Sequence, residues 1–220
     1  MALSGSFYNY PVSSFGLYCE WSASQSITGN YSDVTLNVYL SYYTIEVGTR
    51  SDSSLQINGS SETYTTPAIT DYTSGWKKKF LKSRTVRVYH DGNGNASPSL
   101  GASWRFSGTY SGTYINWIET SSTAYLNQID RTAPTVNIST SAITASGVTV
   151  SATASTTCDV WDYSTDNGSS WTNFSNSAAT SASKTITGLS PNTSYTIRVR
   201  ARKKSNQVYG TSGGTTIITL

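Results

Sequence analysis

The 220-residue sequence is poor in the side chains that most often perform chemistry or bind metal, with one histidine, one methionine and two cysteines. Only 12% of its residues are charged, and the formal net charge of +3 gives no argument for binding nucleic acid. A single histidine offers no readable Ser-His-Asp arrangement, the scattered acids nominate no pair for glycoside cleavage, and no glycine-rich phosphate loop occurs. The sequence therefore predicts a protein that is not an enzyme, with no catalytic, metal-binding or cofactor-binding residues.

Long apolar runs are missing as well. No run approaches the roughly 20 residues that a helix needs to cross a bilayer, so we expect no membrane insertion. The first ten residues, MALSGSFYNY, contain neither a basic segment nor an apolar one and do not resemble a signal peptide. A fragment cut from a secreted parent would also lack such a signal.

The two cysteines, Cys19 and Cys158, are far apart in the sequence and fall in different predicted domains. We expect each to be a small buried residue on a strand rather than one half of a disulfide. Two free thiols are typical of assembly in a reducing cytoplasm.

Serine, threonine, asparagine and glycine dominate the sequence, together with 16 tyrosines and 6 tryptophans. Ser, Thr and Asn compete for the backbone hydrogen bonds of a helix, whereas Thr, Val, Tyr and Trp pack well on a pleated sheet. Apolar and polar residues alternate over residues 15–22 and 34–41, the pattern of half-buried strands. We therefore predict an all-β protein whose N-terminal part is an antiparallel, jelly-roll-like β-sandwich. Its other strands are expected at residues 54–57, 62–66, 85–90, 102–107 and 113–125.

A short polar stretch, residues 130–134, marks a change from Tyr-rich to Ser/Thr/Ala-rich composition. We therefore expect two domains, residues 1–131 and 132–220. The second domain has about seven predicted strands, the number in an immunoglobulin-like β-sandwich. These strands are expected at residues 136–139, 148–153, 159–164, 170–174, 184–189, 195–202 and 215–220.

The segment Leu-Ser-Pro-Asn-Thr-Ser-Tyr ends at Tyr195 and is followed at alternate positions by Ile197, Val199 and Ala201. In this spacing residues 134–220 resemble a fibronectin type III domain. The resemblance implies that Tyr195 is a tyrosine-corner residue, whose hydroxyl returns to the backbone just upstream. Ile197, Val199 and Ala201 are expected to face the core.

The second domain departs from the fibronectin type III pattern in lacking the usual early core tryptophan. Trp161 and Trp171, in the next predicted hairpin, are the candidates to replace it. Membership of this family does not identify a ligand, because its members bind many partners or act as spacers.

Four segments of residues 4–131 are informative because of the order in which they occur: WSASQSI at 21–27, NYSDVTL at 30–36, VRVYHDGNG at 86–94 and LNQIDR at 126–131. In these segments the first domain resembles minor structural proteins of tailed bacteriophages that infect Gram-positive hosts. The resemblance implies a virion protein of the tail, baseplate or fibre, or a decoration of the head. It brings no catalytic residues with it.

A virion protein of this kind would be assembled in the host cytoplasm and bind other virion proteins and itself. Particle symmetry predicts a homo-oligomer, a trimer or a ring. One module would anchor to the particle while the other projects, with host cell-surface polysaccharide as a further partner. The alternative is a carbohydrate-binding or adhesion fragment of a secreted bacterial protein.

Aromatic residues beside Gly- and Ser-rich stretches form the first candidate contact site: Trp76, Tyr110, Tyr114 and Trp117. Aromatic faces stack on sugar rings, and Tyr and Trp anchor protein interfaces. The alternative for each of them is packing in the core of the sandwich.

A basic cluster adjoins Trp76 and contains Lys77, Lys78, Lys79, Lys82, Arg84 and Arg87. It would contact anionic cell-wall polymer or a neighbouring virion protein, or else form a solvated edge strand on which lysine discourages aggregation. The same two interpretations apply to a second basic group. It consists of Arg198, Arg200, Arg202, Lys203 and Lys204.

His90, the single histidine, ends a predicted strand before a tight turn, and a structural role is favoured over that of a base or metal ligand. The next residues, Asp91 to Asn95, place oxygen ligands at alternating positions, as at the start of a calcium loop. The twelfth position holds Ala102 in place of the expected glutamate. A hairpin turn is therefore favoured over a calcium site, and the same applies to residues 166–168.

Overall fold

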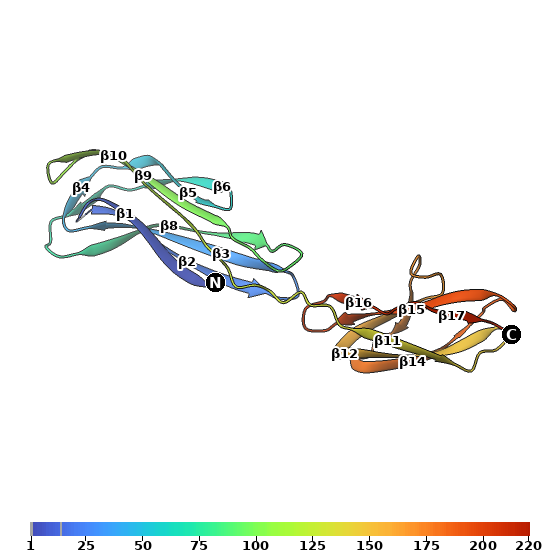
Figure 1. The fold of residues 1–220 in the computed structure, drawn as a ribbon. Coiled ribbons are helices and arrows are strands. Elements are labelled where there is room, and N and C mark those ends of the chain that lie inside the picture. Colours follow the sequence, from blue (N-terminus) through green and yellow to red (C-terminus); the bar gives the residue numbers. More distant parts are fainter. Residues whose placement is uncertain (1, 14) are drawn as a thin grey trace. The chain divides into compact units, whose positions relative to one another are not determined.

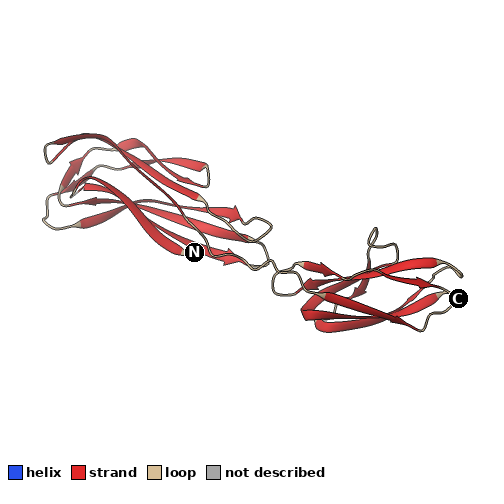
Figure 2. Ribbon diagram, viewed as in Figure 1, coloured by secondary structure: helices blue, strands red, loops and turns tan. Residues whose placement is uncertain are grey.

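The computed structural model describes residues 2–13 and 15–220, and every regular element in these residues is a strand (Figure 2). The prediction of an all-β chain built from antiparallel sheets is therefore confirmed. The chain divides into two compact units, Met1–Ile129 and Asp130–Leu220. In the described part, no helix is long and apolar enough to span a membrane.

The first unit contains two four-stranded antiparallel sheets and one short strand pair (Figure 1). The first sheet has the order β1-β2-β3-β8, comprising Ser4–Val12, Phe15–Ser26, Tyr31–Tyr42 and Lys77–Tyr89. The second sheet has the order β10-β9-β5-β6, comprising Thr113–Thr123, Ser99–Tyr110, Arg50–Ile57 and Ser60–Thr66. The pair consists of β4 and β7, at Ile45–Val47 and Ile69–Asp71.

The core of the first unit forms where the alternating sequence turns its apolar side inward. In β3 the side chains of Val34, Leu36, Val38 and Leu40 are fully buried, while the residues between them are partly exposed. The second sheet contributes its own buried side chains, among them Trp104. Burial of these apolar side chains supplies the main driving force for folding the unit.

Polar contacts join the two sheets at both edges. At one edge Glu62 of β6 forms ion pairs with Lys82 (2.6 Å) and Arg84 (3.4 Å) of β8. At the other edge the Asn9 side chain of β1 donates a hydrogen bond to the backbone carbonyl of Glu119 on β10. In a Greek key the fourth strand returns to lie beside the first, whereas here β8 lies beside β3. The strand order of this sheet is therefore not that of a Greek key.

Three strands of the first unit were not predicted: β1, β4 and β7. Strand β1 escapes a pattern search because Phe7 is its only buried residue. Strand β1 is stabilised by its pairing with β2, although its own sequence shows no strand pattern. Strands β4 and β7 have three residues each, too few to display a period.

The second unit is also built from antiparallel strands. These are β11 (Val136–Ser141), β12 (Gly147–Ser164), β13 (Thr172–Ser175), β14 (Ala179–Thr187), β15 (Ser194–Lys203), β16 (Tyr209–Thr211) and β17 (Thr215–Ile218). The first half of β12 pairs with β11 and β14, and its second half pairs with β13 and β15. A single strand thus belongs to two layers, where the sequence predicted two separate strands. The short strand β16 was not predicted.

The segment around Tyr195 has the predicted geometry. The Tyr195 hydroxyl accepts a hydrogen bond from the backbone amide of Ser190 at 2.9 Å. Ile197, Val199 and Ala201 are fully buried, as their alternation predicted. Trp161 is fully buried and fills the core, whereas Trp171 lies near the surface against Arg200.

The start of the second unit is held by its β15–β16 hairpin. Lys203 forms an ion pair with Asp130 at 2.7 Å, and Arg131 donates to the carbonyl of Asn206 at 2.9 Å. The Asn206 side chain in turn donates to the carbonyls of Asp130 and Thr132. The compact unit therefore begins at Asp130, two residues before the boundary expected from composition.

Candidate functional site

His90 is a structural residue that joins a strand to a turn. Its Nδ1 lies 2.7 Å from the carbonyl oxygen of Gly94, and its Nε2 lies 2.7 Å from the hydroxyl of Ser32. A carbonyl oxygen only accepts, so Nδ1 is the donor, and in the neutral ring Nε2 accepts from Ser32. The ring is buried with both nitrogens occupied, which agrees with the favoured structural interpretation.

The segment from Asp91 to Asn95 is a turn closed by its own carboxylate. One oxygen of Asp91 accepts from the amides of Asn93 and Asn95, at 2.9 and 2.8 Å. These bonds, led by that from Asn95, lower the pKa of Asp91. One of the two carboxylate oxygens of Asp91 is therefore engaged by the backbone of the turn. Across residues 2–13 and 15–220, no group of three His, Cys, Asp or Glu side chains is placed to hold a metal ion.

The predicted aromatic residues Trp76, Tyr110, Tyr114 and Trp117 do not form one site. Tyr110 is half-buried, because its ring stacks on the core residue Phe15 with centroids 4.3 Å apart. For this residue the core-packing alternative holds. Tyr114 is exposed on β10, and Trp117 lies beside Arg105 on the outer face of the second sheet.

Trp76 belongs to a different surface, the outer face of the first sheet. It is 56% exposed, and its ring meets that of Tyr10 edge-on with centroids 6.0 Å apart. Tyr10 lies over Gly16, where a Cβ atom would come within 2.3 Å of the tyrosine ring and 2.2 Å of the Asn9 carbonyl oxygen. The absence of a side chain at Gly16 therefore lets Tyr10 lie flat on the sheet beside Trp76.

A continuous line of aromatic residues crosses the same face. Tyr8 of β1 is paired with Tyr18 of β2, Tyr18 with Tyr39 of β3, and Tyr39 with Phe80 of β8. Directly paired residues point to the same face, so the four side chains project from one face of the sheet, one from each strand. The ring of Tyr8 itself stacks on that of Tyr10. We call these four residues, Tyr8, Tyr18, Tyr39 and Phe80, the aromatic row.

The three consecutive lysines have three different environments. Lys77 is paired with Asp71 at 2.9 Å, and hydrogen bonds from Thr73 and Lys77 hold the pKa of Asp71 well below its usual range. Lys78 lies over the ring of Tyr18, with its Nζ 3.2 Å from the centroid, and 3.9 Å from a carboxylate oxygen of Glu20. Lys79 is exposed and forms no ion pair within the described residues. Strand β8 is also an edge strand, as one interpretation of the cluster expected.

The second basic group is largely neutralised. Arg200 is paired with Asp162 at 2.9 Å and lies between the rings of Trp171 and Tyr209. Arg202 is paired with Asp159 at 3.0 Å. These contacts support the solvated-face interpretation over that of an anion-binding patch.

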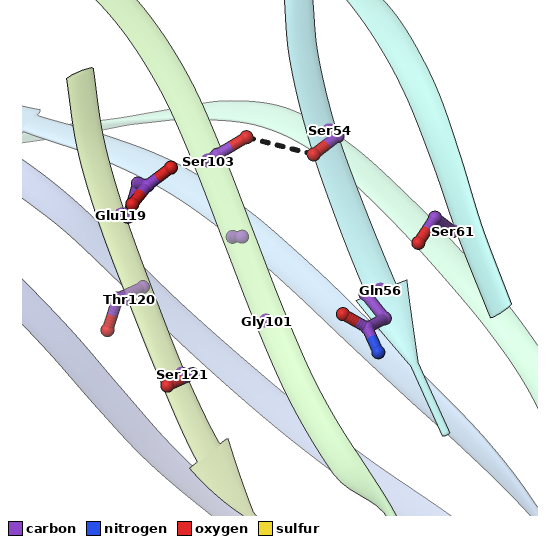
Figure 3. A pocket seen from close by; sticks show the side chains of 9 residues that line it. Ser54, Gln56, Ser61, Gly101, Ser103, Glu119, Thr120 and Ser121 are labelled. Carbon is purple, nitrogen blue, oxygen red and sulfur yellow. Dashed lines mark hydrogen bonds between the residues drawn. The ribbon is translucent and has the colours of Figure 1, made fainter. Parts of the chain in front are cut away.

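A shallow polar hollow of about 390 Å³ lies on the outer face of the second sheet (Figure 3). Gly101 lies on its floor, between Gln56 of β5 and Ser121 of β10 in the strand register. Ser54 and Ser103 are hydrogen-bonded at 2.8 Å along its border. Hydroxyl, amide and carboxylate groups line this hollow without an aromatic platform, which leaves the first sheet as the stronger candidate.

The sequence indicated Trp76 and Lys78 but not the aromatic row or Tyr10. A signal for part of it was present, because Tyr18 and Tyr39 occupy the outward positions of two correctly predicted strands. What the sequence could not supply was the register that sets these residues beside Tyr8 and Phe80. The resulting surface is suited to adsorbing a ligand, since it offers apolar rings and hydrogen-bonding groups.

No protein-family model matches this chain, and no curated protein matches it.

Proposed function

We propose that this chain is a non-enzymatic structural and adhesive protein of a tailed-bacteriophage virion, located in the tail, baseplate or fibre or decorating the head. The observation that carries the adhesive part is the aromatic row with Trp76 beside it on an open sheet face. Rings held on a rigid sheet bind at low entropic cost, because few rotamers are lost on contact. The virion assignment rests on the four segments of the first domain that resemble phage structural proteins.

The carboxylates support a role other than catalysis, because most of them form ion pairs or accept the hydrogen bonds of turns. Ion pairs engage Glu20, Asp33, Asp52, Glu62, Asp71, Asp130, Asp159 and Asp162. Asp91 and Asp166 close turns. The general acid of a glycoside hydrolase is a carboxyl group held above its usual pKa, and every shifted Asp and Glu among the described residues has its pKa lowered.

For the second unit we propose a fibronectin type III module that acts as a spacer or an anchor. Its supports are the hydrogen bond between Tyr195 and Ser190 and the two sets of partners of β12, which are β11 and β14 along its first half and β13 and β15 along its second. The first unit would then present the adhesive face to host-surface polysaccharide. Partner virion proteins and further copies of this chain would complete the assembly as a trimer or ring.

The test is the location of the protein in purified particles. Mass spectrometry of intact virions and antibody labelling in electron micrographs are expected to place it on the tail or head surface. Antibodies against the first unit are expected to block adsorption to host cells. Absence of the protein from particles would overturn the virion assignment.

The second candidate is a carbohydrate-binding fragment of a secreted bacterial protein, which the same aromatic face would serve. Genomic neighbourhood separates the two functions. Tail and lysis genes beside this one favour the virion protein, whereas a signal peptide on a longer parent favours the secreted one.

A further inference from the structure

The aromatic row is long, straight and fixed by backbone pairing. Its four residues occupy directly opposite positions on four neighbouring strands, so it spans three strand spacings, or about 14 Å. The ring centroids of Tyr18 and Tyr39 lie 6.4 Å apart, and those of Tyr39 and Phe80 lie 5.7 Å apart. Such a row offers several successive contacts to a ligand that lies across the strands.

The row is open at both ends. Tyr8 is 63% exposed and Phe80 is 53% exposed, although both stand on a well-paired sheet. Apolar side chains so far out of the core contribute little to folding, and large exposed apolar clusters mark contact surfaces. Tyr8 and Phe80 are therefore available to a ligand without any rearrangement of the sheet, whereas the Lys78 side chain covers Tyr18 and would have to move aside.

A polar hollow of about 410 Å³ adjoins the row at Tyr18. Glu20 and Asn37 supply carboxylate and amide groups to its lining. Apolar faces beside hydrogen-bonding groups are the combination that a sugar requires, because a sugar presents C–H faces and hydroxyl edges together.

The charge of the surface selects among ligands. Lys78 and Glu20, the charged residues next to the hollow, lie 3.9 Å apart and balance each other. Their neighbours on this face are hydroxyl and amide residues, such as Asn37, whose side chain accepts a hydrogen bond from Ser83. Because these two charges balance, the hollow itself gives an anionic polymer no electrostatic advantage.

We propose that the aromatic row and the adjoining hollow form a binding site for a neutral polysaccharide, which lies across strands β1, β2, β3 and β8 with its sugar rings stacked on the aromatic residues. This proposal rests on the adhesive part of the proposed function and names its ligand class and its site. Stacking on Tyr8, Tyr18, Tyr39 and Phe80 supplies most of the affinity. Glu20 and Asn37 bind hydroxyl groups.

The test compares the wild-type chain with Tyr8→Ala, Phe80→Ala and the double variant. The control is Tyr125→Ala, which removes an equally exposed tyrosine (66%) away from the row. Affinity electrophoresis through gels containing a soluble β-glucan, an α-glucan or an N-acetylglucosamine oligomer gives the affinities, with glycerol-phosphate teichoic acid as the anionic probe. We expect retardation by at least one neutral polymer, about fivefold weaker in each single variant and unchanged in the control. Thermal melting of each variant verifies that it is folded.

Three outcomes would overturn the proposal: no retardation by any neutral polymer, equal loss in Tyr125→Ala, or binding of the teichoic acid alone. A fourth is loss of self-association or of binding to another virion protein in the row variants, since the face would then be a protein interface. Any of these results leaves the virion assignment intact if particles still contain the protein. Conversely, retardation by a neutral polymer with no protein in particles supports this site and removes the virion role.

Discussion

At the scale of single residues, the cysteines show how burial controls reactivity. Burial raises the pKa of the Cys19 thiol to about 12 and also raises that of Cys158. Because the thiolate is the reactive form, we expect both thiols of the native protein to resist an aromatic disulfide reagent at mildly alkaline pH. Both should react within seconds in denaturant. Rapid stoichiometric labelling of the folded protein would contradict the buried positions.

Tyr195 gives a second prediction at this scale. Tyr195→Phe removes the hydroxyl that accepts from the Ser190 amide, and we expect a loss of about 1 kcal/mol in the free energy of unfolding. Chemical denaturation of the fragment 130–220 measures it. Tyr209→Phe is the control, because the Tyr209 hydroxyl forms no hydrogen bond among the described residues. Equal losses in the two variants would show that the tyrosine corner contributes nothing specific.

The residue scale also shows what a sequence reveals about a site. Burial of Ile197, Val199 and Ala201 was predictable, because alternation within one strand decides which side chains face inward. The aromatic row was not, because it depends on the registers of three strand pairs, and the strands of one pair, β3 and β8, are more than thirty residues apart along the chain. For Tyr110 the sequence left core packing and surface contact both open, because the residue that decides between them, Phe15, is distant in sequence.

At the scale of elements, β12 explains the main difference between predicted and observed strands. Its first half alternates regularly, with Val148, Val150 and Ala152 buried, but its second half buries Cys158, Trp161 and Ser164 at intervals of three. Register shifts accompany this change of spacing. The alternation of buried and exposed residues therefore breaks down within β12 although the backbone stays extended, and the sequence suggested two strands where the chain forms one.

The turn after β12 gives a prediction about pH. Hydrogen bonds from Ser164 and Ser170 hold the pKa of Asp166 well below its usual range. A lowered pKa in the folded state stabilises the fold above the unfolded value, near pH 4, and this contribution disappears as the pH falls further. We therefore expect the melting temperature of the second unit to fall below about pH 4.

The variant Asp166→Asn isolates that contribution. It is expected to melt lower than the wild type at neutral pH and to lose less stability on acidification, because the neutral amide does not titrate. Thermal melts of both proteins across the acid range give the two slopes. Equal slopes of melting temperature against pH in the two proteins would show that Asp166 does not contribute to the loss of stability in acid.

At the scale of the whole molecule, each unit has a hydrophobic core of its own. We expect the fragment 130–220 to fold alone and to melt at a higher temperature than the fragment 132–220. The longer fragment retains the Lys203–Asp130 ion pair and the Arg131–Asn206 hydrogen bond. Differential scanning calorimetry measures both, and Lys203→Gln in the longer fragment should reproduce part of the difference. Identical melting temperatures would mean that residues 130 and 131 belong to a linker.

Composition located the division between the units to within a few residues, but it could not decide to which side Asp130 and Arg131 belong. That depends on Lys203 and Asn206, more than seventy residues further along the chain. Local alternation of apolar and polar residues predicted the class of fold. The edges of the units and the make-up of the aromatic row depend instead on pairings between segments that are distant in the sequence.

The position of β11 has a mechanical consequence. The second unit begins at Asp130, and its first strand, β11, begins at Val136. The Leu220 amide is bonded to the carbonyl of Thr144, just past the other end of that strand. A tension applied between Asp130 and Leu220 therefore acts along β11, and the six residue pairs that join it to β12 resist in shear together. Forced unfolding is governed by the rate of crossing that barrier, so this unit is suited to carrying load as a tether.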